Sequence, residues 1–237
     1  MVQPGSAEWW ERRRLASPRP RRPRAGGLTL DRILDAALEA IDADGLDALT
    51  MRRLADQLGT SHASLYRHVE SHHEIVVLLV DRVLGDPRLD HVPPGRGGPR
   101  ATAERALRQY REVLLEHPAL TPAFLWGQLL GPHALDRREQ GLRLLLDAGA
   151  TPEVAARAYL ALTHFVITSA VFASSGAGRS PAERATMATM FSGLPPDRYP
   201  TVVALAGVLN DTDDLAEFEL GLAALLDHVG VLVTTPT

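Results

Sequence analysis

The segment 50–68, TMRRLADQLGTSHASLYRH, constrains the fold of this chain more than any other part of the sequence. Thr50 and Ser61 are residue types that cap helix N-termini, so the segment predicts two short helices at 51–58 and 62–68. The glycine-containing stretch between them is typical of a tight turn. Two short helices joined in this way form a helix-turn-helix.

Apolar residues recur at helical spacing on both sides of this segment. The stripe that precedes it consists of Leu30, Ile33, Leu34, Ala37, Leu38 and Ile41. This spacing predicts a helix over 30–44. Ser71 and Glu74 have the spacing of a capping box just before an apolar run, which predicts a further helix over 72–85.

The second half of the chain is also predicted to be helical. Residues 86–99, DPRLDHVPPGRGGP, are rich in Pro and Gly and indicate a connection between two modules. The helices expected beyond it are 100–116, 120–129, 132–148, 152–174, 181–191, 198–209 and 213–229. No strand-like alternation persists, so we expect an all-α protein. Its three-helix domain at 28–85 would be joined by a fourth helix to a larger helical domain at 100–230.

Two of these helices, 152–174 and 213–229, are apolar on more than one face. A helix of this kind must be covered on both sides. A monomer with a larger core would supply this cover from its own chain, and an assembly would supply it from a second chain.

The charge distribution restricts any nucleic-acid function to a local surface, because the net charge is -4 and the pI is about 6.1. Residues 1–27 have no periodicity and are predicted to be a disordered arm. Its arginines Arg19, Arg21, Arg22 and Arg24 alternate with Pro or follow one another. An extended arginine arm suits the narrow minor groove of DNA, and an ordinary disordered tail is the alternative.

Several classes of chemistry are absent from the sequence. The chain has no Cys, which excludes disulfides, zinc–thiolate sites and cysteine nucleophiles. No nucleophile elbow, phosphate loop, dinucleotide motif or His/Glu metal pair is present, so we expect no enzyme activity, no cofactor and no metal. No run of apolar residues reaches the ~18 that a membrane span needs, and no signal peptide is evident. We therefore expect a cytoplasmic protein without membrane contact.

The second helix of the helix-turn-helix is short and carries small or polar residues. Such a helix can enter the major groove of DNA, which is about 12 Å wide. The candidate groove residues are Ser61, His62, Ser64 and Arg67. Helical bundles that do not bind DNA share this pattern, so the pattern alone does not establish DNA binding. The arginine-rich arm gives the inference separate support.

Residues 29–86 resemble the N-terminal domain of the tetracycline-repressor (TetR) family along their whole length. The resemblance is carried by the Ala/Gly pattern around Ala40 and Gly45, by LTMRRLADQLG, by LYRHV and by the acidic residue opening the next helix. Residues 113–174, including LTHFVITSAVF, and the final FELGLAALLDHV are similar to the ligand-binding core of the tetracycline-repressor subgroup.

This resemblance implies a homodimer that reads a palindromic operator in double-stranded DNA. In the family, residues matching Thr50 and Arg52 approach phosphates, those matching Ser61, His62, Ser64 and Arg67 lie on the recognition helix, and those matching Tyr66 and His68 touch the DNA backbone. His72 stands where the family usually has a phosphate-binding Lys. An ordinary His pKa near 6.5 would leave that contact only partly charged at pH 7.

The resemblance also implies that a small-molecule inducer enters the C-terminal domain and releases the DNA. Phe124 and Phe172 stand where tetracycline repressors carry a metal-binding His and a carboxylate, so we expect no magnesium–tetracycline site. The residues expected to line a largely apolar pocket are Phe124, Trp126, Leu129, His164, Phe165, Thr168 and Phe172. Core packing is the alternative for the aromatics and for His164. An activator, or a regulator without a small ligand, also stays open.

Overall fold

The computed structural model describes residues 2–16, 27–90, 97–127, 129–175, 180–210 and 213–234. Within these residues every regular element is helical, which confirms the predicted fold class. The N-terminal part comprises α1 (Ala7–Ala16), α2 (Leu30–Asp44), η1 (Leu46–Ala48), α3 (Met51–Gln57), α4 (His62–Leu65) and α5 (His72–Leu84).

Local capping fixes where the helices of this part begin. The N-caps are Thr29, Thr50, Ser61 and Ser71, and each side-chain oxygen accepts a backbone N–H from the first turn. Gly59 follows α3 with a φ of 60° and so supplies the left-handed residue of the tight turn. The helix-turn-helix therefore has the boundaries that its capping residues predict, except that the last helix is shorter than 62–68.

Helix α1 lies inside the segment that was expected to be disordered, and that expectation was wrong for residues 7–16. Trp9 is only 8% exposed and belongs to the main hydrophobic core. The Arg13 Nη1 atom donates to the Glu74 Oε1 atom of α5 at 2.6 Å. These contacts stabilise a helix that has no apolar stripe of its own. The arm residues Arg19, Arg21, Arg22 and Arg24 lie outside the described residues.

The larger domain begins with a 3₁₀ turn. Its elements are η2 (Pro87–Leu89), α6 (Gly98–Glu116), η3 (Thr121–Leu125), α7 (Pro132–Asp147), α8 (Pro152–Ser174), α9 (Pro181–Ser192), α10 (Pro200–Ala204), α11 (Ala206–Asn210) and α12 (Asp214–Thr234). The helix expected at 120–129 is the short η3, bounded by Pro122 near its start and Gly127 after its end. The helix expected at 198–209 is divided into α10 and α11, and Pro200 opens the first of them.

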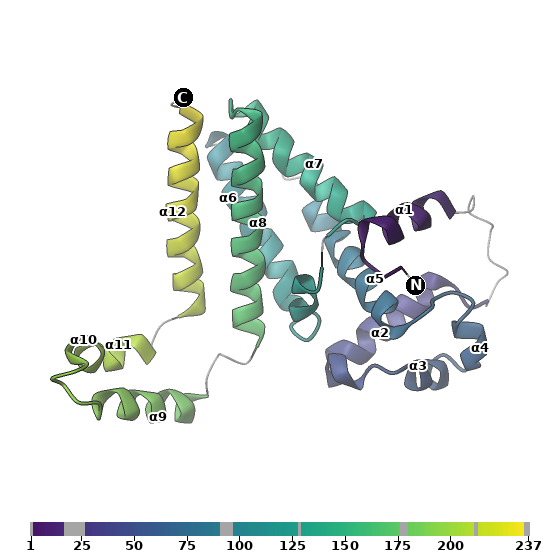
Figure 1. Cartoon of the computed structure of the whole chain (residues 1–237), viewed down its shortest axis with the longest axis horizontal. Coiled ribbons are helices and arrows are strands. Elements are labelled where there is room, and N and C mark those ends of the chain that lie inside the picture. Colours follow the sequence, from purple (N-terminus) through teal and green to yellow (C-terminus); the bar gives the residue numbers. More distant parts are fainter. Residues whose placement is uncertain are drawn as a thin grey trace.

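Helix α8 is the centre of the larger domain and packs against α6, α7, α12 and η3. In Figure 1, α8 and α12 run side by side, and the unit formed by α9, α10 and α11 projects from their lower ends. Among the described residues, α8 is also the one helix long and apolar enough to cross a membrane by length and composition. A bundle-core helix passes the same test, and the packing of α8 against three long helices fits that interpretation.

Helix α5 connects the two parts of the molecule. It contacts α2 in the N-terminal part and α7 and η3 in the larger domain. Ile75 and Leu79 are fully buried, and one continuous hydrophobic core extends from α2 through α5 to α8 and α12. A movement of α5 would therefore disturb the packing of both the N-terminal part and the larger domain.

Candidate nucleic-acid interface and ligand cavity

The exposed end of the N-terminal part is formed by α3, the turn at Gly59, and α4. The Ser61 Oγ atom accepts the backbone N–H of Ser64 at 3.2 Å, which fixes the start of α4. The Arg67 Nη2 atom donates to the Ser64 Oγ atom at 2.8 Å, so its guanidinium is held against the same short helix. Leu65 is fully buried beneath them and anchors α4 to the core.

Most of the predicted DNA-contacting side chains are accessible on this surface. Thr50, Arg52, Ser61, His62, Tyr66 and Arg67 are exposed, and Ser64 and His68 are half-buried. Tyr66 is notable because a large aromatic ring is 51% exposed beside the recognition helix. Neighbouring Arg53 is exposed as well, but it forms an ion pair with Asp44. These eight predicted residues thus share one end of the domain. The capping pattern and the family resemblance were sufficient to name all of them from the sequence.

His72 differs from the other predicted DNA contacts. It is half-buried at the start of α5, and its Nε2 atom is buried without a hydrogen-bond partner among the described residues. Burial, reinforced by the charge of His73, holds the pKa of His72 below its ordinary value. The imidazole is therefore predominantly neutral at pH 7, and in this arrangement its Nε2 atom does not face solvent.

The junction between α5 and α7 is polar and buried. The Asp81 Oδ1 atom of α5 accepts the backbone N–H of Ala134 at 3.0 Å, in the first turn of α7. Burial raises the pKa of Asp81, and the backbone N–H groups of Ala134 and His133 only partly oppose this shift. A Cβ atom at Gly131 would overlap the Asp81 carboxylate, so the close approach of the chain before α7 requires glycine here.

A cavity of about 690 Å³ lies between η3, α7 and α8, with Leu84 of α5 in its wall. The volume lies within the range of small-molecule sites. Four residues predicted for the ligand pocket line this cavity, namely Phe124, Leu129, His164 and Thr168. We call it the main cavity.

The other three predicted pocket residues lie elsewhere. Trp126 is 44% exposed, stacks on His73 with ring centroids 5.7 Å apart, and lines a neighbouring cavity of about 390 Å³. Phe165 stacks on Phe218 of α12 at 5.5 Å and packs against the core, as the alternative interpretation held. Phe172 is 72% exposed near the end of α8.

Sequence reasoning missed several polar residues of the main cavity. Tyr110 of α6, Arg137 and Arg138 of α7, and Tyr159 and Thr163 of α8 also line it. A signal was available for the α8 residues, because Tyr159 and Thr163 precede His164 and Thr168 at helical spacing. The residues of α6 and α7 join the cavity only through tertiary packing. Among the described residues, no group of three or more His, Cys, Asp or Glu side chains could hold a metal ion.

Two family models match the chain. The model described as "Tetracyclin repressor-like, C-terminal domain" matches residues 93–233. The model described as "Bacterial regulatory proteins, tetR family" matches residues 33–77, which contain the helix-turn-helix.

Individual relatives agree with these matches. The HTH-type transcriptional repressor DrrR1 of Streptomyces coeruleorubidus is 35% identical over 225 residues, which cover 91% of this chain and 82% of that protein. The apo crystal structure of ActR from Streptomyces coelicolor is also 35% identical, with a TM-score of 0.78 over 87% of this chain and 97% of that chain. The crystal structure of ActR in complex with actinorhodin aligns with a TM-score of 0.78, and 86% of this chain is covered.

Proposed function

Because this chain belongs to the tetracycline-repressor family of helix-turn-helix transcriptional regulators, we propose that it is a dimeric repressor released from a palindromic operator by a small molecule. The observation that carries the proposal is the position of α5. This helix follows the exposed helix-turn-helix directly, lines the main cavity through Leu84 and caps α7 through Asp81.

The proposed DNA contacts are the accessible residues around α4. Ser61, His62, Ser64 and Arg67 would face base edges, whereas Thr50, Arg52, Tyr66 and His68 would contact the phosphate backbone. Phosphate contacts fix orientation, and base contacts supply sequence specificity. His72, being neutral and half-buried, would add little attraction for phosphate, and the arm arginines Arg19, Arg21, Arg22 and Arg24 would supply charge instead.

The proposed dimer is supported by apolar side chains left exposed on the two long helices. Leu160 and Phe172 of α8 and Leu215 and Leu220 of α12 are between 46% and 75% exposed. Large exposed apolar surfaces mark interaction sites. A monomer with a larger core would have covered them. A two-fold dimer would present two α4 helices to half-sites about one helical turn apart, ~34–36 Å or somewhat more.

The proposed signal is a drug-sized molecule with a largely apolar body in the main cavity. The ActR relative has been crystallised with actinorhodin and with (S)-DNPA, which supports a ligand-responsive role for a chain of the same fold. Ligand binding would displace α7 and therefore α5. The tilt of α5 would set the distance between the two helix-turn-helix units of the dimer. This is a population shift between two dimer shapes. We place this non-enzymatic role in the cytoplasm, where the DNA is.

The test is a gel-shift of the purified chain on the intergenic DNA flanking its own gene, repeated with candidate hydrophobic metabolites. A shift at nanomolar protein that one compound reverses supports the proposal. A shift that no compound reverses supports the alternative, a regulator without a small ligand. No shift on this DNA, and no selection of any site from random sequence, would overturn DNA binding.

A further inference from the structure

Arg137 of α7 carries buried hydrogen-bond donors that the protein does not satisfy. Its side chain is 14% exposed, and its Nη2 atom donates to the Asp90 Oδ1 atom at 2.6 Å. Its Nε and Nη1 atoms are buried and have no hydrogen-bond partner among the described residues. An unsatisfied buried donor costs about 1–3 kcal/mol, and more when it is charged. A group of this kind in a cavity wall therefore points to an acceptor supplied from outside.

The charge of the main cavity has one sign. The guanidinium groups of Arg137 and Arg138 line it, and none of its described lining residues is Asp or Glu. The partner of Arg137, Asp90, lies outside the cavity, and its side chain is 61% exposed. Cationic groups in a wall of low dielectric favour an anion in the space they enclose.

Three residues with hydroxyl groups line the same cavities as Arg137. Tyr110, Tyr159 and Thr163 line both the main cavity and a second cavity of about 330 Å³ between α6, α7 and α8, and Arg137 lines both as well. These four side chains thus form a polar strip where the two cavities meet. Burial raises the pKa of Tyr110 far above its ordinary value, so its hydroxyl stays protonated and can donate a hydrogen bond.

We propose that the main cavity binds an organic acid, with an apolar ring-containing body in the cavity and a carboxylate against Arg137. The hydroxyls of Tyr110, Tyr159 and Thr163 supply further donors to that carboxylate. Charge-assisted hydrogen bonds from a guanidinium to a carboxylate are among the strongest polar contacts in proteins. This inference rests on the proposed inducer site and names the chemical class of its ligand.

The probe is 1-pyrenebutyric acid, compared with its methyl ester, which has the same ring system and no charge. Binding to the full chain is measured by pyrene fluorescence at pH 7.5 without DNA. The acid should bind about tenfold more tightly than the ester. Arg137→Gln should abolish this preference, and the control Arg157→Gln should keep it, because Arg157 is exposed on α8 and lines neither cavity.

A structural role for Arg137 predicts different results. If the residue served only its ion pair with Asp90, Asp90→Asn and Arg137→Gln would lower the melting temperature equally and leave the acid preference intact. We expect instead that Asp90→Asn retains the preference. Should Arg137→Gln fail to fold, Tyr159→Phe gives a second test, with a several-fold weaker affinity for the acid and an unchanged affinity for the ester.

Equal affinities of the native chain for acid and ester, or binding of neither, would overturn the inference. So would an Arg137→Gln variant that binds the acid as tightly as the native chain. Since no DNA is present, a chain that binds the acid but no operator would defeat the repressor proposal and leave this inference standing. A chain that is released from its operator by uncharged molecules alone would defeat this inference and leave the repressor proposal standing.

Discussion

At the residue scale, the N-terminal helix is attached to the rest of the molecule by the buried ring of Trp9 and by an ion pair to one buried carboxylate, that of Glu74. Glu74 is 2% exposed, and its Oε1 atom accepts from Arg13 while its Oε2 atom accepts the backbone N–H of Glu70 at 2.5 Å. The Arg13 guanidinium also lies 5.2 Å from the centre of the Trp9 ring. The carboxylate thus closes the turn before α5 and holds α1 on top of it.

Removing the Arg13 charge should destabilise the protein. Arg13→Met leaves Glu74 buried with one charged partner fewer, and charged hydrogen bonds contribute about 1.5–3 kcal/mol. We expect the free energy of unfolding in urea to fall by about that amount. The control is Arg12→Met, because Arg12 and Glu8 form an exposed pair that contributes only ~0.3–0.5 kcal/mol. Equal effects of the two substitutions would show that α1 is not anchored through Glu74.

Tyr66 and Arg67, which directly follow α4, should make different kinds of contact with DNA. Arg67→Ala should lower affinity for the operator by about 1–3 kcal/mol and relax the preference at one base pair, as expected for a base-edge contact. Tyr66→Ala should weaken binding to all sequences alike. The measurement is fluorescence anisotropy on the operator and on its single-base variants. A uniform loss of affinity for Arg67→Ala would place its guanidinium on a phosphate.

At the element scale, the junction of α5 and α7 depends on a carboxylate that is buried at some cost. Asp81 accepts backbone N–H groups at the start of α7, a position where the helix dipole favours negative charge. Burial nevertheless outweighs these contacts and raises the Asp81 pKa. The junction is therefore specific in geometry and sensitive to protonation.

Because the folded-state pKa of Asp81 is raised, the folded protein holds a proton more tightly than the unfolded chain. The stability contribution of this group is then fully present below the ordinary Asp pKa of about 3.9, and it is lost as the pH rises through the raised value. The Asp81→Asn variant lacks the titrating carboxyl group, and with it this pH-dependent stability contribution, but keeps one acceptor oxygen. The difference in unfolding free energy, variant minus native, should increase with pH above about 4 in urea titrations. A difference that is constant from pH 4 to 7.5 would contradict the shift.

The contact of α8 with α12 should depend on a glycine. A Cβ atom at Gly221 would lie 2.5 Å from the Phe165 ring, whereas a Cβ atom at Gly230 of the same helix would meet no atom of the described residues within 4 Å. Gly221→Ala should lower the unfolding free energy by about 1–3 kcal/mol through overpacking. Gly230→Ala should raise it by up to ~1 kcal/mol, the helix preference of Ala. Stabilisation by both would show that α12 moves freely relative to Phe165.

Capping explains which elements could be predicted from the sequence. The start of α5 follows from Ser71, and the starts of α3 and α4 follow from Thr50 and Ser61. The Glu74 side chain does not complete the expected capping box, because it accepts the backbone N–H of Glu70. Such signals are local, so neighbouring residues suffice to recognise them. Helix α1 could not be predicted in this way, because Arg13 is held by Glu74, 61 positions away, and Trp9 is buried in a core that the rest of the chain forms.

The same distinction between local and tertiary signals explains which site residues could be predicted. The residues around α4 are adjacent in sequence, so their shared surface was predictable. The main cavity is assembled from η3, α7 and α8 and parts of α5 and α6, so only Phe124, Leu129, His164 and Thr168 were identified in advance. Its arginines were missed because an Arg at a helical position is usually exposed, and only packing shows that the Arg137 side chain is mostly covered.

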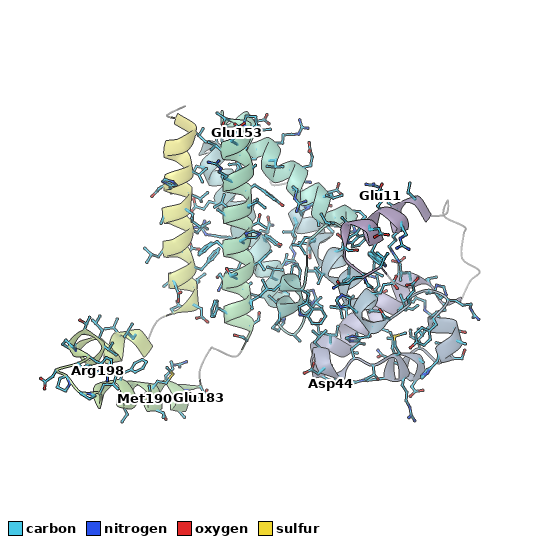
Figure 2. All side chains as sticks on the ribbon, in the orientation of Figure 1. Glu11, Asp44, Glu153, Glu183, Met190 and Arg198 are labelled. Atoms are coloured by element: carbon cyan, nitrogen blue, oxygen red, sulfur yellow. The ribbon has the colours of Figure 1, made fainter. Side chains whose placement is uncertain are left out.

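At the scale of the whole molecule, the surface that remains uncovered indicates where a second copy would bind. Figure 2 shows the α9–α11 unit, with Met190 and Arg198 labelled, standing apart from the body of the domain. Met190, Leu205, Val208 and Leu209 of this unit are 44% to 67% exposed. Helices α8 and α12, from whose lower ends this unit projects, also carry exposed apolar residues. An isologous dimer would cover both regions at once.

The proposed dimer can be tested at Leu220, which is 75% exposed on α12. Leu220→Glu places a charge in the proposed interface, where burying it unpaired would be costly. We expect sedimentation equilibrium to show dissociation to monomers at micromolar protein. Operator affinity should fall with it, because a single half-site is bound far more weakly than two linked ones.

Leu15→Glu is the matched control, because Leu15 is equally exposed, at 77%, but lies on α1 far from that surface. Leu15→Glu should leave the mass of the native dimer in sedimentation equilibrium unchanged. A Leu220→Glu variant that remains dimeric would move the interface away from α12. A monomer that still binds the full operator as tightly as the native chain would show that recognition of the operator does not require two protomers. It would also contradict the mechanism in which α5 sets the distance between two recognition helices.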